Sequence, residues 1–329
     1  MQAIGFNGVD FIEFEKEIDS PSAHDLLVEI RAISINPIDS KVKQTVTKDS
    51  PLKILGYDAA GVVISAGDQT ALFKVGDEVF YAGDMTRDGS NATHQLVDER
   101  LVGRKPSSLS YGQAAALPLT SVTAWESLFD RLKITKTDHD KTLLLIGAAG
   151  GVGSMAIQFA KQVVGINVIA TASRVESKDW CKQMGADVVI NHHDLVGQFK
   201  DSNLDAPDFI LCMGNPDEYF ETMAELIAPQ GSICLLANAG KDYNINLLKA
   251  KSITLVWEMM FTRSMFATKD LVKQHELLNE VADLVDSGKV VTTVTRQLSP
   301  INLENIIEAH TMIEKRDMIG KLVITQITH

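Results

Sequence analysis

The stretch at residues 143–161, LLLIGAAGGVGSMAIQFAK, decides how the rest of the chain is organised. It opens with the apolar run LLLI, which is long enough for one buried strand. A glycine-rich segment at residues 147–153 follows, and apolar residues then recur at helical spacing. A strand, a glycine turn and a helix in this order place a pyrophosphate at a helix N-terminus. The sequence therefore predicts a dinucleotide-binding turn.

The glycines of this turn have different expected roles. Gly150 and Gly151 lack side chains and let the backbone approach a phosphate, and Val152 is predicted to bind the cofactor with them. Gly153 would let the helix pack closely on the strand. Ala148 stands where the first glycine of G-x-G-x-x-G is expected, so the strict pattern is not met. Glycines that only make a tight turn are the alternative.

Short apolar runs alternate with helical patterns beyond this stretch. We expect further strands at residues 167–172, 188–190, 209–212, 232–236 and 253–256. Helical spacing follows the first of them up to Met184, and it recurs at residues 219–228. This alternation is typical of a doubly wound α/β domain with a parallel sheet.

The N-terminal region has a different pattern. Residues 1–120 contain short alternating strand patterns, the clearest at residues 26–35, 61–65 and 77–81. They predict an all-β region, in the form of a partly open barrel. Residues 110–129 turn helical and lead into the nucleotide-binding domain.

The C-terminal region changes pattern once more. Amphipathic helices are expected at residues 270–287 and 302–315. A final strand at residues 320–325 is predicted to return to the N-terminal barrel.

The composition limits the partners that the chain can have. The 329 residues are 45% hydrophobic and 22% charged, as in a globular protein with an ample core. A formal net charge of −12 disfavours nucleic acid and anionic membranes, because both would repel the protein. The three cysteines lie far apart, and the N-terminal segment has neither a basic start nor an apolar core. We therefore expect a cytoplasmic protein without a disulfide framework or a signal peptide.

Segments along the whole chain carry a resemblance. They are INPID at residues 35–39, LGYDAAG at 55–61, VGDEV at 75–79, ALPLTSVTA at 116–124, GAAGGVG at 147–153, KQMGAD at 182–187 and GKLV at 320–323. With them the chain resembles the medium-chain dehydrogenase/reductase superfamily, in its zinc-type alcohol dehydrogenase-like and quinone oxidoreductase branch.

The resemblance implies an α/β protein of two domains. A GroES-like β-barrel catalytic domain would occupy residues 1–120, and a Rossmann NADP-binding domain with a doubly wound parallel sheet would occupy residues 121–260. Residues 261–329 would return to the catalytic domain. The resemblance also implies an active site in the cleft between the domains, and a homodimer, for which the strand at 253–256 could pair across a sheet edge.

The resemblance breaks at the metal ligands. In zinc-dependent relatives a cysteine stands where this chain has Asn36, and a histidine stands where it has Tyr57. Their amide and phenol are poor replacements for thiolate and imidazole ligands. The structural zinc of those relatives needs four closely spaced cysteines, which this chain lacks. His192 and His193 are adjacent and cannot easily share one metal, so we expect no zinc.

Without zinc, the Lewis acid for interconverting alcohols and aldehydes is missing. The expected activity is hydride transfer from NADPH to a small-molecule quinone or an activated alkene, meaning an α,β-unsaturated carbonyl compound. A zinc-independent alcohol or aldehyde oxidoreductase and a non-catalytic nucleotide-binding protein are the alternatives. No RNA-binding pattern of aromatic and basic residues supports the second.

Three residues are candidates for the catalytic site. By resemblance, Asn36 matches an asparagine beside the nicotinamide, with a plain turn residue as the alternative. Lys41 stands where related enzymes often have a tyrosine facing the substrate, and Tyr57 could donate to a carbonyl oxygen. A solvated lysine and a packed aromatic side chain are the alternatives for these two. Asp39 and Asp58 are expected to be turn and scaffold acids.

The end of the second predicted strand bears on the cofactor. NAD enzymes carry an acid there for the ribose 2′-hydroxyl, but this chain has Ser173 and Arg174. Arg174 can bind a 2′-phosphate with its planar fork, Ser173 adds a hydroxyl and Lys178 adds a charge, with ordinary solvated residues as the alternative. By resemblance, His192 takes the place of a phosphate-binding tyrosine, and Thr123 that of a threonine near the nicotinamide, with a plain helix residue as the alternative for Thr123.

Overall fold

The apolar run of the deciding stretch forms β9 (Thr142–Ile146), which is buried from Leu143 onward. The computed structural model describes residues 1–326, and their contacts divide the chain into two units. Unit 1 comprises residues 1–122 and 261–326, and unit 2, which contains β9, comprises residues 123–260. Each unit has its own sheets and its own hydrophobic core.

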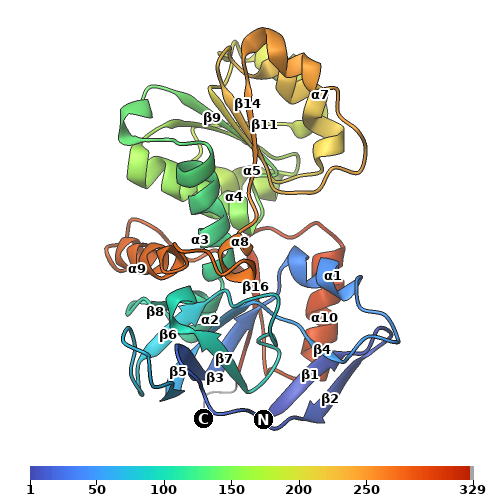
Figure 1. Ribbon diagram of the computed structural model, residues 1–329. Helices are drawn as coiled ribbons and strands as arrows, with labels where there is room; N and C mark the ends of the chain where they lie inside the picture. Colours follow the sequence, from blue (N-terminus) through green and yellow to red (C-terminus); the bar gives the residue numbers. More distant parts are fainter. Residues whose placement is uncertain (327–329) are drawn as a thin grey trace. The chain divides into compact units, whose positions relative to one another are not determined.

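Unit 2 is built on a six-stranded parallel sheet (Figure 1). Its strands lie in the order β11 (Val188–Ile190), β10 (Asn167–Thr171), β9, β12 (Phe209–Cys212), β13 (Ser232–Leu235) and β14 (Thr254–Trp257). Numbered along the chain, these strands have the order 3-2-1-4-5-6 of a Rossmann sheet. The second and third strands extend the sheet to one side of β9, and the last three extend it to the other side. The predicted doubly wound parallel sheet is confirmed.

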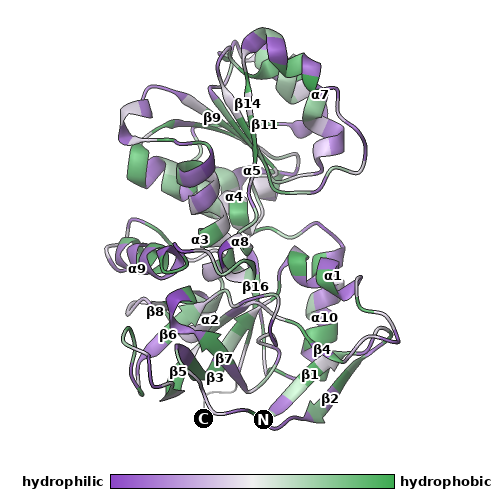
Figure 2. Cartoon of the chain, in the orientation of Figure 1, coloured by the Kyte–Doolittle hydropathy of each residue, from purple (hydrophilic) through white to green (hydrophobic). Residues whose placement is uncertain are grey.

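Helices connect these strands and cover both faces of the sheet (Figure 1). They are α4 (Gly151–Phe159) with its π-helical extension (Ala160–Val164), α5 (Val175–Gln183), α6 (Leu195–Asp201) and α7 (Pro216–Leu226), with 3-10 turns at His192–Asp194 and Ile245–Lys251. The core lies where strand residues such as Leu144, Ile210 and Ile233 meet helix residues such as Phe199 and Phe220. Figure 2 shows the hydrophobic colouring along these strands.

Unit 1 contains two sheets. The larger has the order β15 (Val294–Leu298), β16 (Lys321–Thr325), β3 (Asp25–Ser34), β5 (Asp58–Ala66), β6 (Glu78–Tyr81) and β8 (Val102–Arg104), and β7 (His94–Asp98) also pairs with β3. The smaller has the order β2 (Phe11–Glu15), β1 (Gln2–Phe6) and β4 (Lys53–Ile54).

Helices complete unit 1. They are α1 (Pro37–Lys43), α2 (Tyr111–Ala115), α8 (Thr262–Met265), α9 (Lys273–Asp286) and α10 (Leu303–Glu314), with a 3-10 turn at Glu99–Leu101. The chain passes into unit 2 within α3 (Pro118–Trp125), which is followed by a π-helix (Glu126–Arg131) and a 3-10 turn (Lys136–Asp138).

The last strand returns to the N-terminal sheet, as the sequence predicts. β16 runs antiparallel to β3, with Val323 opposite Ser34 and Ile324 opposite Ile33. Ile33 and Ile324 belong to the core of unit 1, together with Ile306 of α10. The return therefore joins the two chain segments of unit 1 in one core.

Some predicted elements differ in extent. The helical run expected at 110–129 is divided, because α2 ends at Ala115 and Pro118, which has no N–H to continue a helix, begins α3. The strand expected at 253–256 is shifted by one residue, since Ile253 N donates to Leu248 O and so belongs to the preceding turn. β5 begins at Asp58, earlier than expected, and this brings Asp58 into the sheet.

Candidate active site

A buried acid joins the start of α1 to the segment before β5. Asn36 is the N-cap of α1, and Pro37 occupies its first position, where its missing N–H costs nothing. The Asp39 carboxylate accepts hydrogen bonds from Asn36 N at 2.7 Å and from Gly56 N at 2.9 Å. Burial raises the pKa of Asp39 to about 7, against the lowering effect of these bonds and of the Lys321 charge.

Lys321, at the start of β16, is the centre of a buried polar network. Its Nζ lies 2.5 Å from Asn36 Oδ1 and 3.0 Å from Asp58 Oδ2. Asn36 Nδ2 donates to Asp58 Oδ2 at 2.9 Å and to Ser34 O at 3.2 Å. Asp58 Oδ1 accepts from Leu119 N at 2.8 Å. Both amide hydrogens of Asn36 are therefore donated to acceptors within unit 1, namely Ser34 O and Asp58 Oδ2.

Tyr57 has a different environment from its neighbours in the chain. Its side chain is fully buried, and its hydroxyl has no hydrogen-bond partner among residues 1–326. The ring meets Phe261 edge-on, with the centroids 5.2 Å apart. Burial raises the pKa of Tyr57, and the charges of Asp39 and Asp84 raise it further. The phenol is therefore neutral at physiological pH and keeps a proton to donate.

The structure does not bring the third catalytic candidate into this network. Lys41 lies exposed in the last turn of α1, where the helix dipole favours a cation. Asn36 and Tyr57, by contrast, are both buried. Asn36 donates a hydrogen bond to Asp58, and Tyr57 directly precedes Asp58 in the chain.

The donor set does not fit zinc. Between residues 1 and 326, no group of three or more His, Cys, Asp or Glu side chains has a geometry that could hold a metal ion. The two positions that the resemblance compares with zinc ligands hold Asn36 and Tyr57, and an ammonium already lies against Asn36 and Asp58. A divalent cation placed there would be repelled by Lys321.

The glycine turn of unit 2 fits a dinucleotide pyrophosphate. Gly147 has φ +85°, and a side chain at Gly153 would place Cβ 2.3 Å from Ala148 O, so the helix packs against the turn only with glycine there. At Gly150 the nearest atom to such a Cβ would be 3.9 Å away, so this side of the turn is open. α4 begins at Gly151, and its first amides have no partner within the helix. The half-buried Val152 lies in the same helical turn.

The 2′-phosphate candidates follow β10 at the carboxyl edge of the sheet. Arg174 is the N-cap of α5 and is exposed, whereas Ser173 and Lys178 are half-buried. Lys178 N donates to Arg174 O at 3.0 Å, which places the two residues one helical turn apart. The first acid beyond β10 is Glu176, inside α5.

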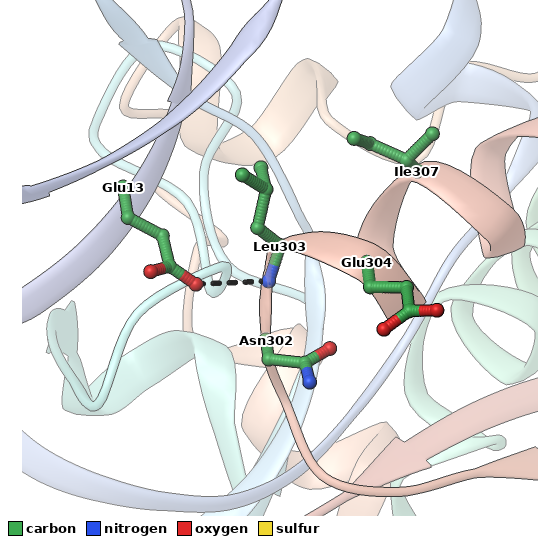
Figure 3. A pocket seen from close by; sticks show the side chains of 5 residues that line it. All are labelled: Glu13, Asn302, Leu303, Glu304 and Ile307. Carbon is green, nitrogen blue, oxygen red and sulfur yellow. Dashed lines mark hydrogen bonds between the residues drawn. The ribbon is translucent and has the colours of Figure 1, made fainter.

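His192 lies at the same carboxyl edge, in the turn after β11. Its ring centroid is 4.3 Å from that of His193, and burial together with the His193 charge lowers the pKa of His192. Both histidines line a polar cavity of 280 Å³ with Glu218 and Tyr219 of α7. Another pocket, of 510 Å³, lies in unit 1, and none of the residues that line it is a predicted site residue. Figure 3 shows these residues: Glu13, Asn302, Leu303, Glu304 and Ile307.

Thr123 and Lys321 also bear on the candidate site. Thr123 is buried within α3, and its carbonyl oxygen accepts a hydrogen bond from Ser127 Oγ at 2.7 Å. The role of Lys321 was missed in the sequence, although GKLV at 320–323 was recognised. The available signal was a lysine at the head of an otherwise apolar final strand, since a buried lysine requires a partner.

A GroES-like unit joined to a Rossmann unit defines a class of oxidoreductases. The model "Alcohol dehydrogenase GroES-like domain" matches residues 22–123, and the model "Zinc-binding dehydrogenase" matches residues 151–282. The chain belongs to the medium-chain dehydrogenase/reductase family.

Relatives from several organisms match nearly the full length. A zinc-type alcohol dehydrogenase-like protein of Staphylococcus aureus (strain MSSA476) is 44% identical over 335 residues, covering 98% of this chain and 99% of that one. The solved structure of a candidate zinc-dependent alcohol dehydrogenase from Rhizobium etli CFN 42 is 44% identical, with a TM-score of 0.94 and coverage of 100% and 99%. A chloroplastic NADPH-dependent alkenal/one oxidoreductase of Arabidopsis thaliana is 28% identical, covering 98% of this chain and 78% of that protein.

No helix within residues 1–326 has the length and apolarity that a membrane crossing requires.

Proposed function

We propose that this protein is an NADPH-dependent oxidoreductase that reduces quinones or the conjugated double bond of α,β-unsaturated carbonyl compounds, without zinc. The observation that carries the proposal is the Lys321 ammonium, which lies against Asp58 and against Asn36, the residue that the resemblance puts in place of a zinc-ligating cysteine. An acceptor that is already electron-poor needs less polarisation than a simple aldehyde, so it suits a site without a Lewis-acid metal. The relative named as an alkenal/one oxidoreductase supports this substrate class.

The residues of unit 2 supply the binding site for NADPH in this proposal. The open turn at Gly150 accommodates a pyrophosphate, and a carboxylate that would repel a 2′-phosphate is lacking at the end of β10. When bound, the reduced nicotinamide supplies a hydride for the electrophilic carbon of the acceptor. The residues that would hold the cofactor are Thr123, Gly150, Gly151, Val152, Ser173, Arg174, Lys178 and His192.

Tyr57 is the proposed hydrogen-bond donor to the substrate oxygen. Negative charge develops on that oxygen when the acceptor is reduced, and a pre-positioned donor stabilises it. Among the three catalytic candidates, Tyr57 alone combines burial with a hydroxyl that has no partner in residues 1–326. Asn36 and Lys321 hold Asp58, the next residue in the chain, and thereby fix the backbone that carries Tyr57.

The test measures NADPH consumption with four classes of acceptor: quinones, enones, enals and simple aldehydes. We expect turnover with quinones or conjugated carbonyl compounds, little turnover with simple aldehydes, and no loss of rate after incubation with a metal chelator. Elemental analysis of the same sample checks the zinc content.

Two results would contradict the proposal. Zinc bound at a stoichiometric level, with activity lost on its removal, would show that the enzyme depends on the metal. Tight NADPH binding with no turnover of any acceptor class would point to a nucleotide-binding protein.

A further inference from the structure

The loop that follows β13 is tied to the first turn of α7. The Asp217 carboxylate accepts a hydrogen bond from the Tyr243 hydroxyl at 2.6 Å, and each of its oxygens lies 3.1 Å from Gly240 N. Asp217 is the second residue of α7, whose N-cap is Asn215. One carboxylate therefore joins residues 240 and 243 to a helix more than twenty positions earlier in the chain.

Packing supports the same connection. The Tyr243 ring stacks on Phe220, one helical turn beyond Asp217, with the centroids 4.3 Å apart and an interplanar angle of 10°. A side chain at Gly240 would place Cβ 2.5 Å from Asp217 Oδ2, so it would displace the carboxylate from its present position. We call Asp217, Phe220, Gly240 and Tyr243 the loop clasp.

The loop clasp lies in the second half of the Rossmann sheet. α7 follows β12, and residues 236–244 follow β13, so both leave the sheet at the carboxyl ends of neighbouring parallel strands. A Rossmann sheet consists of two mononucleotide-binding halves, and ligands bind outside the carboxyl ends of its strands. The glycine turn and Arg174 belong to the first half, with β9 and β10. The loop clasp therefore orders backbone where the second nucleotide of a dinucleotide binds.

We propose that the loop clasp positions residues 236–244 for the nicotinamide nucleotide of NADPH, which makes Asp217 and Tyr243 positioning residues for the cofactor. This inference rests on the proposed function, because it assumes that NADPH is the ligand. Residues 238–242 are exposed, so the clasp restricts a segment that few other contacts restrain. A restrained loop binds more tightly, since less conformational entropy is lost on binding.

The test compares two ligands in one set of variants. Tyr243→Phe keeps the stacked ring and removes the hydroxyl that donates to Asp217. We expect its Kd for NADPH to rise about threefold to tenfold, as for one lost hydrogen bond. The Kd for 2′,5′-ADP, which contains only the adenosine half, should stay within about twofold, because that half binds beside β9 and β10. Glu221→Gln, which alters an exposed acid of α7 outside the loop, is the matched control and should change neither Kd.

A second variant and the wild type complete the design. Gly240→Ala should open the clasp by the steric conflict with Asp217 and reproduce the selective loss of NADPH affinity. Unchanged NADPH binding in both variants, or an equal loss for NADPH and 2′,5′-ADP, would overturn the role of the clasp. The proposed function would still stand in that case if the wild type binds NADPH. A wild type that binds no NADPH would overturn both.

Discussion

Tyr57 is the side chain on which the proposed chemistry depends most directly. Replacing it with phenylalanine removes the buried donor and keeps the ring against Phe261. We expect kcat/KM for the acceptor to fall about tenfold to a hundredfold, since the charge on the substrate oxygen loses a donor. The Kd for NADPH should not change. Steady-state kinetics and a binding titration measure the two quantities.

Tyr81 provides a matched control for this experiment. Its hydroxyl is also buried without a partner among residues 1–326, and burial likewise raises its pKa. Tyr81→Phe therefore makes the same chemical change in the same unit, and we expect its activity to match the wild type. Equal activity of Tyr57→Phe and Tyr81→Phe would rule out Tyr57 as the donor.

Arg174 is the residue that should decide between the two nicotinamide cofactors. Arg174→Ala should weaken NADPH binding by about 1.5–3 kcal/mol, the range for a hydrogen bond to a charged group, and leave NADH nearly unchanged. Comparison of kcat/KM for the two cofactors measures this difference. Lys182→Ala, at an exposed position of the same helix, is the control. A wild type that prefers NADH, or equal losses for both cofactors, would contradict the assignment.

Lys321 is expected to matter for stability as much as for the site. Lys321→Met would leave the Asp58 carboxylate buried without a compensating charge. Removing one partner of a buried pair costs about 3–5 kcal/mol, which urea unfolding can measure. Adding Asp58→Asn should recover part of this loss, because the uncompensated charge is then gone. A loss below about 1 kcal/mol for Lys321→Met would show that the pair contributes little.

The network around Lys321 also shows what the sequence could and could not predict about the site. Asn36 and Tyr57 could be singled out because they replace known ligand types within short motifs. The contacts of Lys321 span 285 residues to Asn36 and 263 residues to Asp58. Side-chain pairing over such separations depends on strand order and register, which a single sequence does not contain. The loop clasp could not be predicted for the same reason, because its residues are far apart in the sequence and form no local motif.

At the scale of elements, the parallel strands were the most predictable part of the fold. The central strands β9, β12 and β13 are short apolar runs buried on both faces, and such runs have clear ends. The hairpin of β1 and β2 was not predicted, because β2 is buried at only one position and has a weak apolar pattern. The helical run expected at 110–129 is interrupted at Pro118. This proline is present in the sequence, but the apolar periodicity continues across it and favours one uninterrupted helix.

α10 carries a histidine that should make stability depend on pH. His310 is buried against Phe11, and burial lowers its pKa to about 4, with a further lowering by Lys43 and an opposing effect of Glu314. In the unfolded chain the pKa is near 6.5, so the unfolded state binds more protons between these values. The free energy of unfolding should therefore fall by up to about 3 kcal/mol as the pH decreases from 6.5 to 4.

The check compares urea unfolding of the wild type and His310→Leu across this pH range. Asp39, whose pKa is raised to about 7, contributes with the opposite sign in both proteins, so the difference between them isolates His310. We expect the wild type to lose stability relative to the variant as the pH falls. Parallel pH profiles would show that His310 does not titrate between the two states.

At the scale of the whole molecule, the family resemblance and the exposed edge of the unit 2 sheet lead us to expect a homodimer. β14 is an edge strand, and Trp257 at its end is 51% exposed. An unpaired apolar edge favours pairing with a second copy. Light scattering should give twice the chain mass of 36.0 kDa, and Val256→Lys should reduce it. A monomer at micromolar concentration would contradict this expectation.

The position of β16 has a consequence for the order in which the protein is made. Unit 2 is continuous in the chain, and all of its strands precede β16. During synthesis, all strands of the Rossmann unit therefore leave the ribosome before β16, at a stage when β3 can pair with β5 and β7 but still lacks β16. Asp58 and Lys321 are 263 positions apart in the chain, so Asp58 lacks this partner until the later segment has been translated. The network around Lys321 therefore forms only after the strands of the Rossmann unit have been synthesised, and a nascent chain that has not reached β16 carries the Rossmann unit without that network.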